Sequence, residues 1–312
     1  MKRTEIFIKR IKEFGLIYAL KMYYIKSFKP NRKYIQLLTS RLQKEFNDEI
    51  LNISETESKV MYEKIPIWTM WWQGVDSLPE VLKLCYNSHI QHIDSSKYEY
   101  IVIDQWNYKK YVDVPQYIEN KLKIGIISFT HFSDLLRIML INKYGGLWLD
   151  ITMILNSNLD KRIFNYPFYS INQSGSTYRP NGLGQEITMS KWAGFMYSSN
   201  TACNAVFSFM EACLLKYWKK YNYTIDYFLS NLLLRSAYDK NDIVKNLIDK
   251  VPINNVSLYD LQPILNEEFD EHLLKSLTAT TQLFKVTQKK DWFKIKDGKT
   301  TFYGYFYNKY SK

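Results

Sequence analysis

The sequence predicts an α/β protein in which buried strands and helices alternate around a mainly parallel sheet. Residues 64–74 have the apolar pattern of a strand that runs into a loop, and residues 98–104 form a second apolar run, with a helical pattern between them. Residues 131–152 then join a further helix to a short strand through two glycines. Strands that alternate with helices in this way are typical of βαβ units and a parallel sheet.

The first half of residues 131–152 has the periodicity of a helix with one apolar face. Asp134 and Arg137 are three residues apart, so they are neighbours on the surface of that helix, beside the apolar stripe. Gly145 suits the left-handed position that ends a helix. We therefore expect Asp134 and Arg137 at the edge of a pocket. The stripe consists of Phe132, Leu135, Leu136, Met139 and Leu140.

After Gly146 the periodicity changes to that of a strand, with Trp148, Asp150 and Thr152 on one face. A carboxylate and a hydroxyl at a strand end, beside a second carboxylate and an arginine, suit a divalent cation and a phosphorylated sugar. Oxygen ligands favour Mg²⁺ or Mn²⁺. Taken singly, each residue also fits a structural role, such as an Asp–Arg pair on a core helix. Their combination favours a functional site.

Composition and charge limit the kinds of partner. The 312 residues are 46% hydrophobic and 16% aromatic, which indicates a globular chain able to bury a sizeable core in one or two domains. The 26 tyrosines suit sugar-binding surfaces and half-buried core positions alike. The formal net charge of +11 predicts an anionic partner, and residues 1–33 contain ten Lys or Arg against two Glu. Anionic lipid is favoured over nucleic acid, because no nucleic-acid motif is present.

The three cysteines, Cys85, Cys203 and Cys213, are scattered and lack the spacing of a zinc site. The sequence has no stretch of eighteen apolar residues and no leader-like start with a cleavage site. We therefore expect a protein of the reducing cytoplasm that is neither secreted nor membrane-spanning.

The pattern of residues 1–58 predicts a helical extension that precedes a folded domain of residues 59–312. Apolar residues and lysines interleave before Pro30, as in a basic amphipathic helix that either lies in a bilayer interface or packs on the domain. A second helix, about residues 32–46, leads into a linker at residues 52–59.

Other residues of the domain have two interpretations. Asp104, at a strand end, either touches a ligand or caps the next turn, and capping is favoured. His131 fits a structural hydrogen bond better than a catalytic base. The Gly-rich residues 173–185 form either a loop that closes over substrate or a surface loop. Later residues predict strands at 167–172 and 189–197, helices at 202–221, 225–237 and 242–250, and a hairpin around Asp297–Gly298.

One motif carries a family resemblance. The run SDLLR at residues 133–137, nine residues ending in Gly145 and Gly146, and then LWLDIT at residues 147–152 resemble the donor-site signature of family 32 type glycosyltransferases. More narrowly, they resemble the bacterial capsular polysaccharide synthesis branch. The resemblance extends from about residue 65 to about residue 218.

The resemblance implies a GT-A type fold, Rossmann-like with helices on both sides of the sheet, a donor half at about residues 59–155 and an acceptor half at about 156–312. It implies that Asp134 hydrogen-bonds sugar hydroxyls, that Arg137 contacts the sugar or its phosphate, and that Trp71 stacks on uracil. Without it, a tryptophan cluster after a strand belongs more often to the core. The implied catalytic residues are Asp134, Arg137 and Asp150. The implied donor site is Trp71, Gly74, Ser133, Asp134, Arg137, Gly146, Trp148 and Asp150.

The resemblance also implies a metal, Mn²⁺ or Mg²⁺, at Asp150 and Thr152. Family members hold it with two aspartates, and Thr152 stands at the second position, as is common in the capsule branch. A hydroxyl binds a metal ion more weakly than a carboxylate does, so the metal dependence is determined by which other residue or water completes the ligand set. Residues 278–285 resemble a segment that returns to the donor site, with Thr280, Thr281 and Lys285 as candidate ligands. Family members retain anomeric configuration, and no second carboxylate here stands out as a nucleophile.

The leading hypothesis is an enzyme at the inner face of the cell membrane, docked there by residues 1–33. It would move a sugar from a UDP-linked donor to a lipid-linked or polysaccharide acceptor in capsule or exopolysaccharide synthesis. The alternative is a non-catalytic nucleotide-sugar or glycan-binding protein on the same scaffold, with turnover lost through Thr152. A nucleic-acid-binding protein ranks last.

Overall fold

The computed structural model describes residues 3–55, 58–59, 62–175 and 182–311. Its centre is a mixed five-stranded sheet with the order β3-β2-β4-β7-β6. β2 pairs in parallel with β3 and β4, whereas β7 pairs antiparallel with β4 and β6. The predicted parallel sheet is therefore correct for its centre, and one flank is antiparallel. The strands are β2 (Ile65–Met70), β3 (Tyr98–Ile103), β4 (Gly146–Leu149), β6 (Tyr169–Ser170) and β7 (Met196–Ser199).

The register of the parallel strands determines which loops meet. Trp68 of β2 lies opposite Trp148 of β4. The strands run the same way, so Trp71 and Asp150, each just beyond its strand, emerge at one edge of the sheet. Ligands of open α/β sheets bind at this carboxyl edge.

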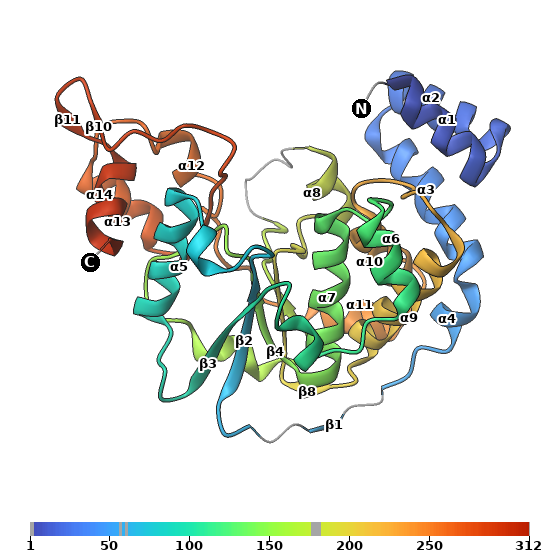
Figure 1. Ribbon diagram of the computed structural model, residues 1–312, viewed down its shortest axis with the longest axis horizontal. Coiled ribbons are helices and arrows are strands. Elements are labelled where there is room, and N and C mark those ends of the chain that lie inside the picture. The colour runs from blue at the N-terminus through green and yellow to red at the C-terminus, as the bar shows by residue number, and fades with distance from the viewer. Residues whose placement is uncertain (1–2, 56–57, 60–61, 176–181, 312) are drawn as a thin grey trace.

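Helices cover both faces of the sheet, and Figure 1 shows α5 on one side and α7 with α9 on the other. α7 packs against α9, and α9 packs in turn against α10. The buried faces of α7, α9 and α10 form one large core with the sheet, whereas the buried face of α5 belongs to a second core. These helices are α5 (Glu80–His92), α6 (Gln116–Lys123), α7 (Phe129–Tyr144), α9 (Ala205–Lys220), α10 (Leu229–Tyr238) and α11 (Asp242–Asp249).

The C-terminal part adds a two-stranded sheet and a second core. β5 (Met153–Leu155) pairs antiparallel with β9 (Leu283–Lys285). The predicted hairpin at Asp297–Gly298 is confirmed, although its strands are short and Thr301 caps a helix by accepting from Gly304 N. The remaining elements are α12 (Leu261–Ile264), α13 (Glu271–Thr278), β10 (Ile295–Lys296), β11 (Lys299–Thr300) and α14 (Phe302–Tyr310), which packs on α5.

The N-terminal residues form α1 (Arg3–Phe14), α2 (Leu16–Phe28), α3 (Asn31–Glu45) and α4 (Asn47–Leu51). The prediction of one helix before Pro30 is wrong, because Gly15 takes a φ of 85° and α2 packs back on α1. α3 packs on α10, and its buried side chains belong to the same core as the sheet. No helix among the described residues is long and apolar enough to cross a bilayer.

Other predicted boundaries shift. The strand expected at residues 189–197 begins only at Met196, because Met189 and Ser190 have positive φ values of 52° and 55° and form a turn. The strand expected at 167–172 is two residues long, and the helix expected from 225 begins at Leu229. In the Gly-rich loop 173–185, residues 176–181 lie outside the described residues. The short elements are β1 (Ser58–Lys59), β8 (Thr201–Ala202), α8 (Leu183–Thr188) and 3₁₀ turns at Val75–Ser77, Tyr108–Lys110 and Lys161–Asn165.

Gly146 permits the closest approach between β2 and β4. Its φ is 81°, and a Cβ built there would lie 2.2 Å from the carbonyl oxygen of Pro66. We expect Gly146→Ala to lower the free energy of unfolding by about 3–5 kcal/mol, since backbone strain and collision with β2 add. Urea denaturation measures this. The control is Gly125→Ala, where φ is 74° but the Cβ meets nothing within 4 Å. It should cost only about 1 kcal/mol, and equal losses would contradict the packing argument.

Candidate functional site

The helix α7 positions two charged side chains at the carboxyl edge of the sheet. Ser128 caps it, as its hydroxyl accepts from His131 N at 3.3 Å, and Gly145 ends it with a φ of 65°. His131 bonds Ser128 Oγ and the Tyr227 carbonyl oxygen through its two ring nitrogens, at 2.9 and 3.3 Å. The structural interpretation of His131 is thus confirmed, and the buried apolar stripe of α7 is anchored at both ends.

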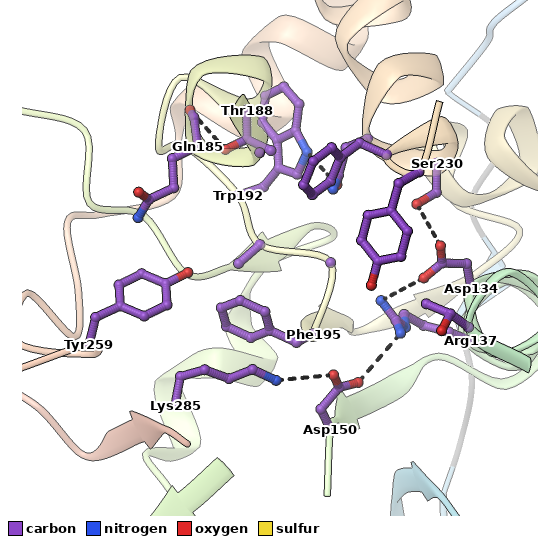
Figure 2. Close-up of a pocket in the computed structure, with 17 residues that line it drawn as sticks. Asp134, Arg137, Asp150, Gln185, Thr188, Trp192, Phe195, Ser230, Tyr259 and Lys285 are labelled. Atoms are coloured by element: carbon purple, nitrogen blue, oxygen red, sulfur yellow. Dashed lines mark hydrogen bonds and ion pairs between the residues drawn. The ribbon is translucent and has the colours of Figure 1, made fainter. Parts of the chain in front are cut away.

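Four charged groups form a continuous line across the site, shown in Figure 2. Arg137 Nη1 lies 3.3 Å from Asp134 Oδ1, and Arg137 Nη2 lies 3.4 Å from Asp150 Oδ1. Lys285 Nζ lies 3.4 Å from Asp150 Oδ2. The signs alternate along the line, so each carboxylate faces at least one cation. At its far end Ser230 Oγ donates to Asp134 Oδ2 at 3.2 Å.

Arg137 is nearly buried, with its side chain 8% exposed. Its guanidinium stacks over the Trp148 ring, 5.0 Å from the centroid, and Trp148 Nε1 donates to Asp150 Oδ1 at 2.7 Å. A Cβ at Gly194 would lie 3.1 Å from Arg137 Nη1, so a glycine there leaves room for the guanidinium. Arg137 Nε is buried without a hydrogen-bond partner among the described residues. This N–H group is therefore one of the few buried donors that the described part of the chain leaves unsatisfied.

Lys285 reaches the site through the β5–β9 pair. Met153 of β5 is its register partner, and Val286 N donates to the Thr152 carbonyl oxygen at 3.0 Å. The ammonium donates to the Thr152 hydroxyl and lies 4.7 Å from the centroid of the Phe195 ring. Burial lowers the pKa of Lys285 below its ordinary 10.5, although Asp150 acts in the opposite direction.

Burial has the reverse effect on the carboxylate at the other end of the line. It raises the pKa of Asp134 above the ordinary 3.8, although the Arg137 guanidinium acts against this rise. A buried carboxylate and a buried ammonium with opposite pKa shifts are typical of functional sites.

Two pockets open on either side of this line, and both are lined by Thr130, Arg137 and Asp150. The first pocket lies toward α8 and α10 and is rich in aromatic rings. Its further lining includes Asp134, Trp192, Phe195, Tyr227, Ser230, Asn231, Tyr259 and Lys285. The second pocket lies toward the loop after β2. Its further lining includes Trp71, Trp72, Gln73, Phe129, Ser133, Trp148, Thr152 and Gln288.

The residues predicted for the donor site are divided between the two pockets and positions outside them. Trp71, Ser133 and Trp148 line the second pocket, and Asp134 lines the first. Trp71 Nε1 donates to Ser77 Oγ at 2.8 Å, which fixes the ring at the pocket wall. Gly74 and Gly146 line neither pocket: Gly74 lies under Trp106, and Gly146 packs against β2.

Several neighbouring candidates have structural roles. The rings of Trp72, Tyr108 and Phe132 pack together, although Trp72 also lines the second pocket. Trp68 is buried and donates to the Gly145 carbonyl oxygen at 3.1 Å. Asp104 accepts from the backbone N–H groups of the following turn, which confirms its capping role. Among the three late candidates only Lys285 reaches the site. Thr281 accepts from Ser257 N instead.

The aromatic side of the first pocket was not predicted. Trp192, Phe195, Tyr227 and Tyr259 come from turns and loops in the second half of the chain. No spacing connects them, so no sequence motif could have indicated that they meet. Only the unusual number of aromatic residues pointed in this direction.

The side chains present do not by themselves fit a divalent metal. The expected ligands are Asp150 and Thr152, but both Asp150 oxygens face cations and Thr152 accepts from Lys285. The described ranges contain no group of three or more His, Cys, Asp or Glu side chains that could surround an ion. A metal here would have to displace the ammonium of Lys285.

The chain is thus a mixed α/β protein with a charged line between two pockets at the carboxyl edge of its sheet, which is the edge where open α/β sheets commonly bind ligands. The comparison with protein families is more specific. The model of the capsular polysaccharide synthesis protein family matches residues 18–306, so the chain belongs to this family. The match indicates a role in capsule biosynthesis. Searches of curated proteins and of solved structures give no match.

Removing Arg137 leaves two partly buried carboxylates without their shared cation. We expect Arg137→Met to lower the free energy of unfolding by about 3–5 kcal/mol at neutral pH. The loss should shrink as the pH falls and the Asp134 carboxylate, whose pKa is raised by burial, becomes protonated. Guanidinium denaturation across the acidic range measures both. Arg162→Met is the control, because Arg162 pairs with Asp160 at an exposed position and should matter little. An equal loss at every pH would contradict the electrostatic explanation.

Proposed function

We propose that this protein is a GT-A type glycosyltransferase, akin to the family 32 enzymes, that acts in capsule biosynthesis. It transfers a sugar from a UDP-linked donor to a lipid-linked or polysaccharide acceptor and retains the anomeric configuration. The observation that carries this proposal is the meeting of two pockets at Arg137 and Asp150. A charged junction between two cavities can hold the diphosphate of a donor whose nucleotide lies in one cavity and whose sugar meets the acceptor in the other.

In this proposal the nucleotide lies in the second pocket. Trp71 offers a ring for the base, since it lines this pocket and is fixed by Ser77. The diphosphate then lies at the junction, where the Arg137 guanidinium lines both pockets and Lys285 supplies an ammonium. Arginine and lysine are the usual phosphate-binding side chains.

The donor sugar and the acceptor occupy the first pocket. Its rings, such as Phe195 and Tyr259, suit the C–H faces of sugars, while Asp134 and Asn231 suit hydroxyl groups. Ser230 already donates to Asp134, which orients that carboxylate toward the cavity side of α7. The acceptor hydroxyl must approach the anomeric carbon from this pocket.

The reaction breaks the bond between the anomeric carbon and the diphosphate oxygen, whose electron pair stays on the phosphate. The bond from the anomeric carbon to the acceptor oxygen forms on the same face. The acceptor proton passes to the departing phosphate oxygen, so no enzyme nucleophile is required. Negative charge grows on the diphosphate as it leaves, and preorganised cations there lower the barrier.

Lys285 and Arg137 provide that positive charge from this chain's own residues. Asp150 lies between them and orients both. Thr152 adds a further bond to the Lys285 ammonium. The expected Mn²⁺ or Mg²⁺ remains a prediction that assays with added metal and with chelator can test.

The first test removes the central carboxylate. Asp150→Asn should lower the turnover of a UDP-sugar by about 100-fold or more, since both cations lose their orienting partner. Product formation is followed by chromatography with extracts of capsule lipid as acceptor. Asp94→Asn, which changes a surface pair with Lys97, is the control and should keep full turnover. Normal turnover by the Asp150→Asn variant would contradict the proposal.

The second test asks whether Lys285 replaces a metal. Lys285→Met should lose about 100-fold in kcat with chelator present, whereas Lys309→Met, another partly buried lysine with a lowered pKa, should not. Transfer needs the ammonium, so the rate should fall as the pH rises through the lowered pKa of Lys285. Lys285→Arg stays charged and should lack this fall. Full activity of Lys285→Met in chelator would exclude the role.

The non-catalytic alternative is favoured by one observation, the engagement of both Asp150 and Thr152 by Lys285. A binding protein would raise its melting temperature with a nucleotide sugar yet show no turnover. Thr152→Asp separates the two: hydrolysis that appears only in this variant would favour the binding protein.

A further inference from the structure

The outer face of α2 is an exposed apolar stripe. Ile17, Leu20, Tyr24 and Phe28 follow one another at helical spacing, and Ile17 and Phe28 are 84% and 67% exposed. Leu16 and Tyr23 are exposed beside them. The opposite face, with Ala19 and Met22, is fully buried. Isolated exposed apolar residues are ordinary, but a contiguous stripe of this kind marks an interaction site.

Exposed basic side chains accompany the stripe on the same helices, and Lys29 Nζ lies 5.6 Å from the centroid of the Tyr24 ring. Lys12, Lys21, Lys29 and Lys33 are all exposed on α1, α2 and the start of α3. Of the two acidic residues in this part of the chain, Glu13 accepts from Asn222 N and is turned toward the body of the protein. The surface therefore combines apolar rings and aliphatic chains with a positive rim.

The orientation of the stripe is fixed by buried contacts behind it. Asp226, with a side chain 4% exposed, pairs with Arg10 of α1 and Lys26 of α2 at 4.0 and 3.5 Å. It also accepts from Tyr34 OH of α3 at 3.0 Å. The three helices are thus anchored to one carboxylate, and α2 cannot roll its apolar face inward without breaking these bonds. Figure 1 shows α1 and α2 at a corner of the molecule away from the sheet.

We propose that the helical hairpin of residues 3–28 is a docking surface for an anionic lipid bilayer. The stripe of α2 lies among the acyl chains just below the headgroups, and the lysines contact lipid phosphates. Charge decides between this occupant and a second copy of the chain. Two copies would bring two positive rims together, whereas an anionic bilayer neutralises one. The proposal does not depend on the transfer reaction.

The experiment measures sedimentation of the full-length chain with vesicles of phosphatidylcholine, with and without phosphatidylglycerol. We expect binding only with phosphatidylglycerol, and weaker binding at high salt. Ile17→Ser/Phe28→Ser should weaken it at least about tenfold. Lys12→Gln/Lys21→Gln should weaken it about 25-fold, at about fivefold for each charge. The control, Phe293→Ser/Ile295→Ser, removes two other exposed apolar residues from the C-terminal part and should bind normally.

Circular dichroism melting shows that each variant is folded. Three outcomes would overturn the proposal: no sedimentation of the wild-type chain, equal binding to uncharged vesicles, or unchanged binding of both hairpin variants. Light scattering adds a fourth. A wild-type dimer that Ile17→Ser/Phe28→Ser converts to a monomer would identify the stripe as an interface between two copies instead.

Discussion

The site depends on one carboxylate, Asp150, which is bonded from three directions. Trp148, Arg137 and Lys285 approach it from the sheet, from α7 and from β9. Each of these three side chains is positioned by packing elsewhere in the fold. The glycine at the start of β4 allows β4 to lie against β2, the capped α7 presents Arg137, and the β5–β9 pair delivers Lys285. Displacement of α7 or of the β5–β9 pair would remove one of the two cations that pair with Asp150.

The sequence predicted best what is local. Residues 131–149 fold as expected, because a cap, an apolar stripe, two glycines and a short strand are set by neighbours along the chain. The strand expected to continue to Thr152 ends at Leu149 instead, because Met153 N donates to the Asp150 carbonyl oxygen and closes a turn. The pairing of Asp134 with Arg137 follows from helix geometry for the same reason. Lys285 and the aromatic wall of the first pocket depend on contacts over long sequence distances, which leave no periodicity. The turn at Met189 and Ser190 was missed because their left-handed backbone carries no glycine signal.

The N-terminal helices are connected to the site by shared contacts, although the two are far apart in the sequence. Asp226 anchors α1, α2 and α3, and the next residue, Tyr227, lines the first pocket and bonds His131 through its carbonyl oxygen. Gln185 lines the first pocket and also a third one, which is formed with Arg32 and Gln36 of α3. The wall of the proposed acceptor pocket is therefore continuous with the helices that follow the apolar stripe.

The late position of Lys285 has a consequence for synthesis on the ribosome. Asp150 and Lys285 are separated by 135 residues, so a nascent chain can form the central sheet and α7 long before its second cation has been translated. During that interval Asp150 has only Arg137 as a charged partner. The charged line is completed when β9 adds to β5, and a ribosome-bound intermediate therefore lacks the finished site. The complete site therefore forms only when the last part of the polypeptide has been translated, after the surrounding fold has formed.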